Sequence, residues 1–204
     1  PWTLPANLAI ALHEQLTYID GDFRNDDGIT ERLIVAKDLI EKFSSATGFV
    51  LIQKHNELGG IQFSETITKH PFMPRDSPVI FADFVNTDTG TGAVHIAPGH
   101  GGDDYMVGKD AGLDILSPVD DQGNYTEEVG IPELIGNHVL KSNQFIIDLL
   151  DSEKALLGKE DYKHSYPHCW RSKTPIIFRA VPQFFIAIDA FRKEALEEID
   201  KVSW

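Results

Sequence analysis

Cysteine is almost missing from this chain of 204 residues, and long apolar runs are missing altogether. The only cysteine, Cys169, excludes an internal disulfide framework and indicates a reducing compartment. No apolar run approaches the ~20 residues of a membrane-spanning helix, and no leader with a charged, an apolar and a small-residue part precedes the first expected strand. We therefore expect a cytoplasmic protein that has no membrane partner.

Basic residues are also scarce. The chain has 18 Lys and Arg against 32 Asp and Glu, which gives a formal net charge of −14. Because Lys and Arg contacts to phosphates supply most of the sequence-independent affinity for nucleic acids, this composition by itself favours a protein that touches none. A local exception lies near the C-terminal end, where basic and histidine side chains gather: Lys163, His164, His168, Arg171, Lys173 and Arg179.

No internal repeat, low-complexity tract or Ser/Pro-rich linker divides the chain, so we expect one domain, residues 1–204. Short runs rich in Val, Ile, Phe and Leu predict strands at 8–12, 32–36, 49–54, 79–85, 93–97, 176–180 and 184–188. Apolar residues at helical spacing predict helices at 37–45, 103–110, 142–157 and 190–199. Strands outnumber helices and alternate with them irregularly, which favours a mainly β core with peripheral helices.

The most informative segment runs from Gly90 to Tyr105. Its first half has the period-two pattern of a strand, with His95 between two alanines on one face. A Pro-Gly-His-Gly-Gly turn follows, and then Asp103 and Asp104 in the expected first turn of a helix. Glycines let backbone N–H groups approach a ligand, and a helix N-terminus favours an ionised carboxylate. We expect the strand, the turn and the helix start to converge on a pocket.

Two further segments point to the same family as the 90–105 segment, and the three occur in the order that this family has. They are the N-terminal Pro-Trp-Thr-Leu-Pro-Ala-Asn and the sequence His-Ser-Tyr-Pro-His-Cys-Trp-Arg-Ser-Lys-Thr-Pro-Ile-Ile-Phe-Arg-Ala at 164–180. Together the three resemble the editing domain of isoleucyl-tRNA synthetases, which hydrolyses misacylated tRNA. The resemblance implies a closed mixed β-barrel of the valyl/isoleucyl/leucyl-tRNA synthetase editing-domain type, decorated by helices and excised from a larger synthetase.

The activity that this resemblance implies is post-transfer editing, the hydrolysis of valyl-tRNA(Ile) at its aminoacyl ester, without a cofactor. The implied partners are the aminoacylated 3′ end of tRNA(Ile) and the rest of the synthetase in cis, and we expect a monomer. The two ATP-binding signatures of an aminoacylation core, His-Ile-Gly-His and Lys-Met-Ser-Lys-Ser, do not occur in the chain.

The carboxylates after the glycine turn receive different roles. The resemblance assigns Asp104, which directly precedes an aromatic residue, to the α-ammonium of the substrate, because an ion pair with a primary ammonium distinguishes an aminoacyl ester from a simple ester. From the residues alone, a second first-turn carboxylate that interacts with the helix dipole is an equal alternative. Asp103 has the better claim to cap the helix through backbone amides.

Three residues of the 90–105 segment are candidates for contact with the substrate. A lone histidine on a strand is more often structural, but the resemblance places His95 beside the amino acid, where it helps to exclude the isoleucyl side chain. His100 is a candidate contact to the terminal nucleotide, although we favour a solvated loop histidine. Thr91, in a Gly-Thr-Gly turn, is a weak candidate because such turns are common.

The resemblance also assigns roles near the two ends of the chain. Thr3 and Asn7 are similar to pocket-lining residues that bind the terminal ribose and hold water, with Thr3 as a catalytic candidate. The family carries a run of threonines directly before Pro-Trp-Thr, whereas this chain starts at Pro1. Trp170 is a candidate for stacking on the adenine or for filling the core.

One segment contains side chains that could bind a metal. His164, His168 and Cys169 invite a zinc interpretation, but no second cysteine follows at two to four residues, so four ligands cannot be completed locally and we expect no metal. Two other functions remain open: a non-catalytic module that binds tRNA ends, and an editing domain of the valyl or leucyl type. The latter families carry Arg-Pro after their threonines, where this chain has Pro1-Trp2, and lack a histidine at the position of His95.

Overall fold

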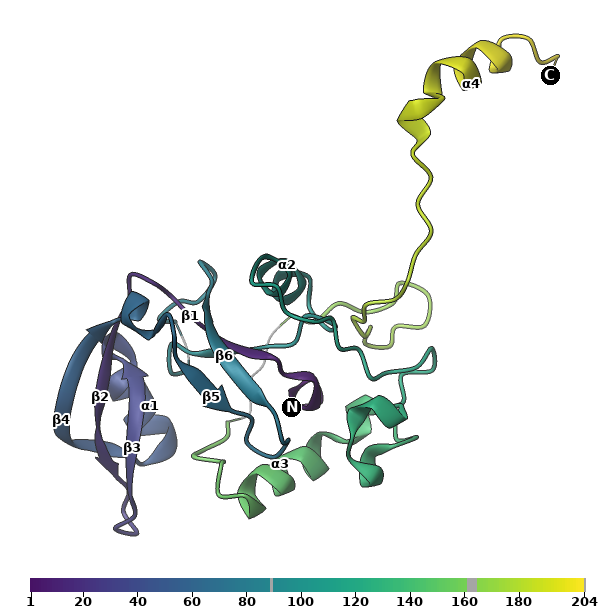
Figure 1. Cartoon of the computed structure of the whole chain (residues 1–204). Coiled ribbons are helices and arrows are strands. Elements are labelled where there is room, and N and C mark those ends of the chain that lie inside the picture. Colours follow the sequence, from purple (N-terminus) through teal and green to yellow (C-terminus); the bar gives the residue numbers. More distant parts are fainter. Residues whose placement is uncertain (89, 161–164, 204) are drawn as a thin grey trace.

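The computed structural model describes residues 1–88, 90–160 and 165–203. The predictions made for Lys163 and His164 therefore lie outside the described residues. The fold is mainly β, with two small sheets side by side and helices at their periphery (Figure 1). No helix in the described part of the chain is long and apolar enough to cross a membrane.

The first sheet has four strands in the order β5-β6-β1-β7. These strands are β1 (Ala9–Leu12), β5 (Ile67–Lys69), β6 (Asp76–Phe81) and β7 (Val94–Ile96). The strand β1 lies in the middle, parallel to β6 and antiparallel to β7. Its alanines are fully buried beside Ile96, and these small side chains let other segments pack closely against the sheet.

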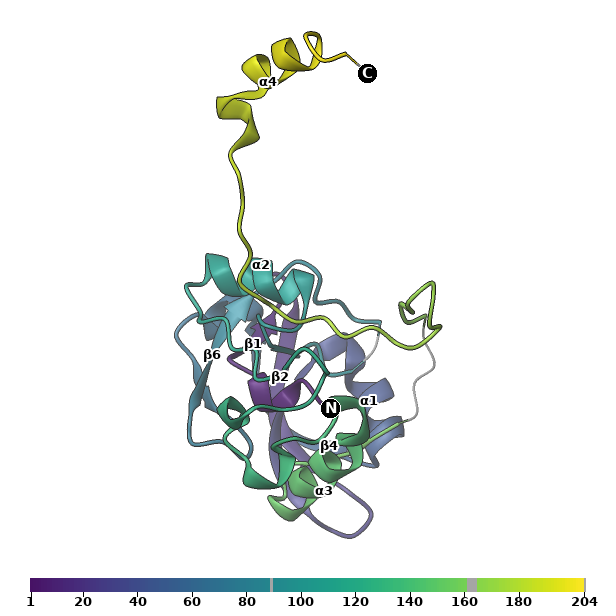
Figure 2. The same ribbon diagram turned by 90° about the vertical axis from the view of Figure 1, so that its right-hand side faces the viewer.

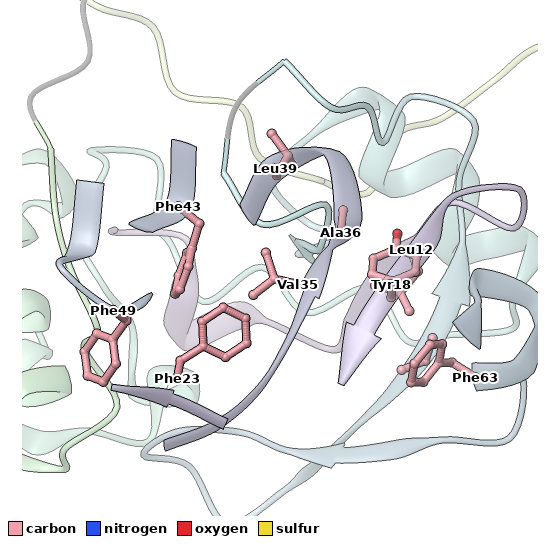
Figure 3. Packing of buried hydrophobic residues seen from close by; sticks show 10 residues of the cluster. Leu12, Tyr18, Phe23, Val35, Ala36, Leu39, Phe43, Phe49 and Phe63 are labelled. Carbon is pink, nitrogen blue, oxygen red and sulfur yellow. The ribbon is translucent and has the colours of Figure 1, made fainter. Parts of the chain in front are cut away.

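The second sheet has three antiparallel strands in the order β3-β2-β4. They are β2 (Thr17–Arg24), β3 (Thr30–Ala36) and β4 (Val50–Gly59), and the helix α1 (Ile40–Thr47) covers one face. The core between them is aromatic: the rings of Phe23 and Phe43 meet edge to face at 5.6 Å, beside Val35 and Phe49 (Figure 3). Gly48, in the left-handed region at φ 76°, ends α1.

The prediction of a closed β-barrel is wrong, because the described strands form two open sheets. Closure needs edge strands that pair along their length. Here β7 has only three residues, and Gly90 and Gly92 precede it with φ of 77°, outside the range of a strand. The end of β3 meets this segment through one backbone bond, from the Ala36 N–H to the Thr91 carbonyl at 2.8 Å. The buried Tyr18 hydroxyl donates to the Gly92 carbonyl at 2.7 Å, a second single link.

A third, mostly irregular layer packs under the N-terminal peptide. It contains α3 (Asn143–Ser152) and the short 3-10 helices η4 (Glu127–Val129), η5 (Pro132–Leu134) and η6 (Val139–Lys141) around a core of buried apolar residues. The Tyr125 hydroxyl donates to the Trp2 carbonyl, and the Trp2 N–H donates to Asn143 at 3.0 Å. This layer therefore holds the chain start in place.

The remaining helices are α2 (Gly102–Asp110), α4 (Arg192–Ile199), η1 (Leu4–Ala6), η2 (Lys37–Leu39), η3 (Gly60–Phe63) and η7 (Ile188–Ala190). Helix α2 lies over the first sheet, whereas α4 stands away from the body in both views (Figures 1 and 2). Residues 181–203 are exposed throughout. All four predicted helices are confirmed, although α3 ends at Ser152, five residues before the predicted end.

The strand predictions are confirmed for five of the seven segments, although β6 ends at Phe81, four residues before the predicted end, and they are wrong for the last two. Residues 176–180 and 184–188 form no strand, because no partner strand pairs with them in the described part of the chain. One backbone bond, from the Ala180 N–H to the Gly99 carbonyl at 2.7 Å, ties the first of them to the body. The strands β2 and β5 were not predicted.

Candidate functional site

The N-terminal peptide folds back over β7 and brings three predicted site residues together. The Thr3 hydroxyl lies 2.9 Å from Nε2 of His95, and the Asn7 amide nitrogen lies 3.4 Å from Nδ1 of the same ring. Pro5 fixes the start of η1, which turns the chain between Thr3 and Asn7. Residues more than 80 positions apart in the sequence therefore form one cluster, which we call the Thr3–His95–Asn7 cluster.

The buried Asn7 fixes the proton positions in this cluster. Its amide nitrogen donates to the Ala9 carbonyl at 2.8 Å, and its amide oxygen accepts from the Ser77 hydroxyl at 2.6 Å. The amide nitrogen is therefore the group that faces Nδ1 of His95, so Nδ1 accepts and Nε2 carries the hydrogen. It follows that Nε2 donates to the Thr3 oxygen, which leaves the hydroxyl hydrogen of Thr3 available to another acceptor.

The His95 ring is neutral near pH 7. Burial lowers the pKa of His95 to about 4, and the nearby Pro1 amino group and the other histidines act in the same direction. With Nδ1 occupied by Asn7, the ring offers no free basic nitrogen. Its position suits orientation and steric exclusion better than proton abstraction.

Asp104 returns to the same strand from the first turn of α2. Its carboxylate accepts the Ala97 N–H at 2.8 Å, two residues beyond His95. Burial raises the pKa of Asp104, while the bond from Ala97 acts in the opposite direction. The neighbouring Asp103 is exposed, and no side-chain bond caps the helix at Gly101. The prediction that Asp103 caps the helix is therefore wrong, and Asp104 bonds instead to the backbone amide that follows β7.

His100 is buried, so the expectation of a solvated loop histidine is wrong. Its Nδ1 donates to the Phe178 carbonyl at 3.0 Å, and its ring meets that of Trp2 edge to face at 5.0 Å. Burial is the main cause that lowers the pKa of His100. The residue joins the glycine turn to the N-terminal peptide and to the segment around Phe178.

Thr91 and Trp170 lie outside the Thr3–His95–Asn7 cluster. Thr91 holds the end of β3 through its carbonyl and lines an open hollow of about 850 Å³ between α1 and residues 155–160. Trp170 is 76% exposed, so the alternative that it fills the core is wrong. It stands at the tip of a hairpin, and Arg171 lies over its ring.

A second hollow, of about 380 Å³, lies beside the glycine turn and borders the N-terminus of α2. It is lined by Gly99, Gly101, Tyr105 and residues of the segment 178–185. Neither hollow includes Thr3, Asn7 or His95 in its lining. In this cluster Asn7 is buried and Thr3 and His95 are partly buried, and the second hollow adjoins the start of α2.

Three residues that hold the N-terminal peptide were not predicted. Ser77 bonds to Asn7, and Arg75 donates to the Pro5 carbonyl. His70 accepts the Met73 N–H on Nδ1 at 3.0 Å, so its Nε2 donates to the Leu4 carbonyl at 2.9 Å. None has a local sequence signal, because each acts on residues about 65–70 positions away. No group of His, Cys, Asp and Glu in the described residues is arranged to hold a metal ion.

The fold has a counterpart among solved structures. A chain described as "The crystal structure of GlLeuRS-CP1" aligns with a TM-score of 0.59, over 79% of this chain and 81% of that one. Sequence identity is 14%, so this likeness concerns the fold. The class defined in this way is a CP1-like domain.

The sequence comparison is more specific. Residues 29–155, which include His95 and Asp104, match the family described as "Leucyl-tRNA synthetase, editing domain", and the chain belongs to this family. Isoleucine--tRNA ligases are similar over the whole chain: 45% identity for Methylacidiphilum infernorum, 46% for Shewanella baltica strain OS155 and 43% for Desulforamulus reducens. The chain spans about a fifth of the length of these relatives, 21–22%.

Proposed function

We propose that this chain is the editing domain of an isoleucine--tRNA ligase and hydrolyses valyl-tRNA(Ile) after transfer. The observation that carries the proposal is the meeting of Thr3, Asn7 and His95, with Asp104 bonded to the same strand two residues further on. The family match and the similarity to isoleucine--tRNA ligases support it. The rest of the synthetase acts in cis, in the cytoplasm, and the editing domain itself is monomeric.

The reaction needs little chemistry from the protein, because an aminoacyl ester is already activated. Water attacks the carbonyl carbon, the ester bond breaks, and the ribose oxygen leaves with a proton. Asp104 anchors the α-ammonium as an ion pair. The Thr3 hydroxyl, whose hydrogen is free, orients the ribose or the water, and a free ribose hydroxyl assists proton transfer. His95 takes no part as a base.

Selectivity is the harder requirement. A hydrophobic pocket discriminates a single methylene by only ~1–3 kcal/mol, a limit known from isoleucyl-tRNA synthetases themselves. A second site that admits only the smaller amino acid overcomes this limit. In the proposal His95 supplies the steric stop, because its ring projects from a strand flanked by the small Ala93 and Ala97. Thr91 and His100 remain predicted substrate contacts.

The test replaces Asp104 by Asn and uses Asp103→Asn as its matched control. Both changes remove one charge from the same helical turn, but only Asp104 is half-buried and bonded to the strand. An amide oxygen still accepts the Ala97 N–H, so the fold of Asp104→Asn should remain intact. Losing one partner of a buried charge pair costs ~2–5 kcal/mol, so the kcat/KM of Asp104→Asn for valyl-tRNA(Ile) should fall about 30-fold or more.

The measurement is release of labelled valine from valyl-tRNA(Ile) by this chain and by a version extended with N-terminal threonines. A wild-type hydrolysis rate in Asp104→Asn, or an equal loss of rate in both variants, would contradict the role of Asp104 as the anchor of the α-ammonium. If neither chain discharges the ester but both bind tRNA, the domain is a non-catalytic tRNA-end module. Discharge of misacylated tRNA(Val) or tRNA(Leu) instead would identify a valyl- or leucyl-type domain.

A further inference from the structure

The hairpin of residues 166–176 is a well-defined structure outside the candidate site. His168 pairs with Pro175, and the N–H of Cys169 donates to the Thr174 carbonyl at 2.9 Å. The Ser172 and Thr174 hydroxyls bond to each other at 2.7 Å, and Tyr166 donates to the Ile176 carbonyl at 3.0 Å. The hairpin projects from one side of the body (Figure 2). Its tip is therefore preorganised.

The charge of this segment is opposite to that of the whole chain. Between Ser165 and Ile188 the sequence contains no Asp or Glu, although the chain has 32 of them. Arg179 is the one cation of this segment that forms a salt bridge within the described residues, to Asp121. Arg171 and Lys173 are exposed and have no carboxylate partner in the described part of the chain. Two unpaired cations therefore flank the tip.

The tip also presents an aromatic ring. Trp170 is 76% exposed even though the Arg171 guanidinium lies over its ring, 5.0 Å from the centroid. An exposed tryptophan is costly in water, and the arginine over its ring helps to hold the indole in place while most of the side chain stays exposed. An exposed aromatic ring next to cationic side chains is the arrangement by which proteins hold single-stranded nucleic acids.

We infer that this hairpin is an RNA contact separate from the Thr3–His95–Asn7 cluster. Trp170 stacks on an unpaired base, and Arg171 and Lys173 contact the adjoining phosphates. The partner is RNA with a single-stranded 3′ tail, and its identification with the acceptor end of tRNA rests on the proposed function. The contact concentrates binding on one point of a chain whose overall charge of −14 repels nucleic acid.

The test measures binding of a fluorescent RNA hairpin with an unpaired 3′ tail, and of the same hairpin with a blunt end, to the 204-residue chain at low salt. The wild-type chain should prefer the tailed probe. Trp170→Ala should weaken tailed-probe binding about fivefold or more and abolish the preference. The double variant Arg171→Gln/Lys173→Gln should weaken binding of both probes and reduce the slope of log affinity against log salt by about 1.4, as expected for two phosphate contacts.

The matched control is Lys193→Gln/Lys201→Gln, which removes the same charge from α4 and the residues just after it, where both lysines pair with glutamates. It should keep the wild-type slope. The inference is overturned if the wild-type chain binds neither probe or if Trp170→Ala keeps the preference for the tailed probe. It is also overturned if the control variant loses as much affinity and salt dependence as Arg171→Gln/Lys173→Gln. The probes carry no amino acid, so Asp104→Asn should bind them normally. Failure of the hydrolysis test is therefore distinguishable from failure of this inference.

Discussion

At the scale of single residues, the proton positions around His95 decide what this histidine can do. The ring nitrogen that a base would use is occupied by Asn7, and the other carries a hydrogen bonded to Thr3. Asn7 is itself held by Ser77 and the Ala9 carbonyl. A histidine so constrained acts by its volume and by orienting the Thr3 hydroxyl.

Replacing His95 by Ala should therefore broaden specificity. The change opens space for the one methylene that separates isoleucine from valine, a difference worth ~1–3 kcal/mol in a hydrophobic pocket. The variant, extended by N-terminal threonines, should hydrolyse isoleucyl-tRNA(Ile) while still discharging valyl-tRNA(Ile). The measurement compares the two rates. Loss of both activities together would show that His95 is catalytic or structural.

His95 should also make stability depend on pH. Its pKa falls from 6.5 to about 4 on folding, so between these values the unfolded chain binds the proton more readily. Stability is therefore lost as the pH falls from about 6.5 to about 4. In His95→Gln the slope of unfolding free energy against pH should decrease, by up to ~1.4 kcal/mol per pH unit.

Chemical denaturation of both proteins across this range measures the slope, and the same change at the exposed His168 is the control. Burial lowers the pKa of His70 and His100 as well, and raises that of Asp104, but these contributions are common to all three proteins. An unchanged slope in His95→Gln would show that the ring takes up its proton without cost in the folded state.

At the scale of elements, the turn between β7 and α2 depends on close backbone approach. A Cβ at Gly99 would lie 2.0 Å from the Leu116 carbonyl oxygen, whereas at Gly102, in the first turn of α2, nothing lies within 4 Å. The first glycine is required by packing, and the second is not.

Gly99→Ala should thus destabilise the protein by ~1–3 kcal/mol, because the backbone of the turn or of Leu116 must shift. Gly102→Ala, the matched control, should be neutral or stabilise by up to ~1 kcal/mol, since alanine favours the helix. Thermal unfolding of both variants checks the difference. Equal melting temperatures would mean that the contact with Leu116 is loose.

At the scale of the whole molecule, the body and the C-terminal extension contribute differently to stability. Residues 186–203 are exposed, including apolar side chains such as Ile186 at 74% and Leu196 at 58%. Apolar surface of this kind favours association with other surfaces. Because these side chains are exposed, they do not contribute to the hydrophobic core of the body.

Deleting residues 186–204 should therefore change the melting temperature of the body by only a few degrees relative to the full chain. The reason is that changes at exposed positions usually alter the free energy of unfolding by no more than ~0.5 kcal/mol. Self-association should decrease. Thermal unfolding and sedimentation measure the two effects. A marked loss of stability would show that the extension packs on the body in solution.

The amino-acid sequence by itself determined the local elements of this protein. The helices and the strand–turn–helix of residues 93–110 follow from apolar spacing and glycines, which act over a few residues. The assignment to an editing family rests on the same kind of linear pattern. The sequence also brought Thr3, Asn7, His95 and Asp104 into consideration, through a resemblance rather than through their contacts.

Only the tertiary structure decided which of these residues meet and in what chemical state. The bond from Ala97 to Asp104 depends on how the turn between them folds, while the burial of His100 and the proton positions of His95 depend on groups from distant segments, among them Ser77 and Phe178. The segments at 176–188 have strand-like composition, but a strand needs a partner, and the described chain supplies none. Hydrogen bonding and burial between distant segments are properties of the packed chain, which no local pattern contains.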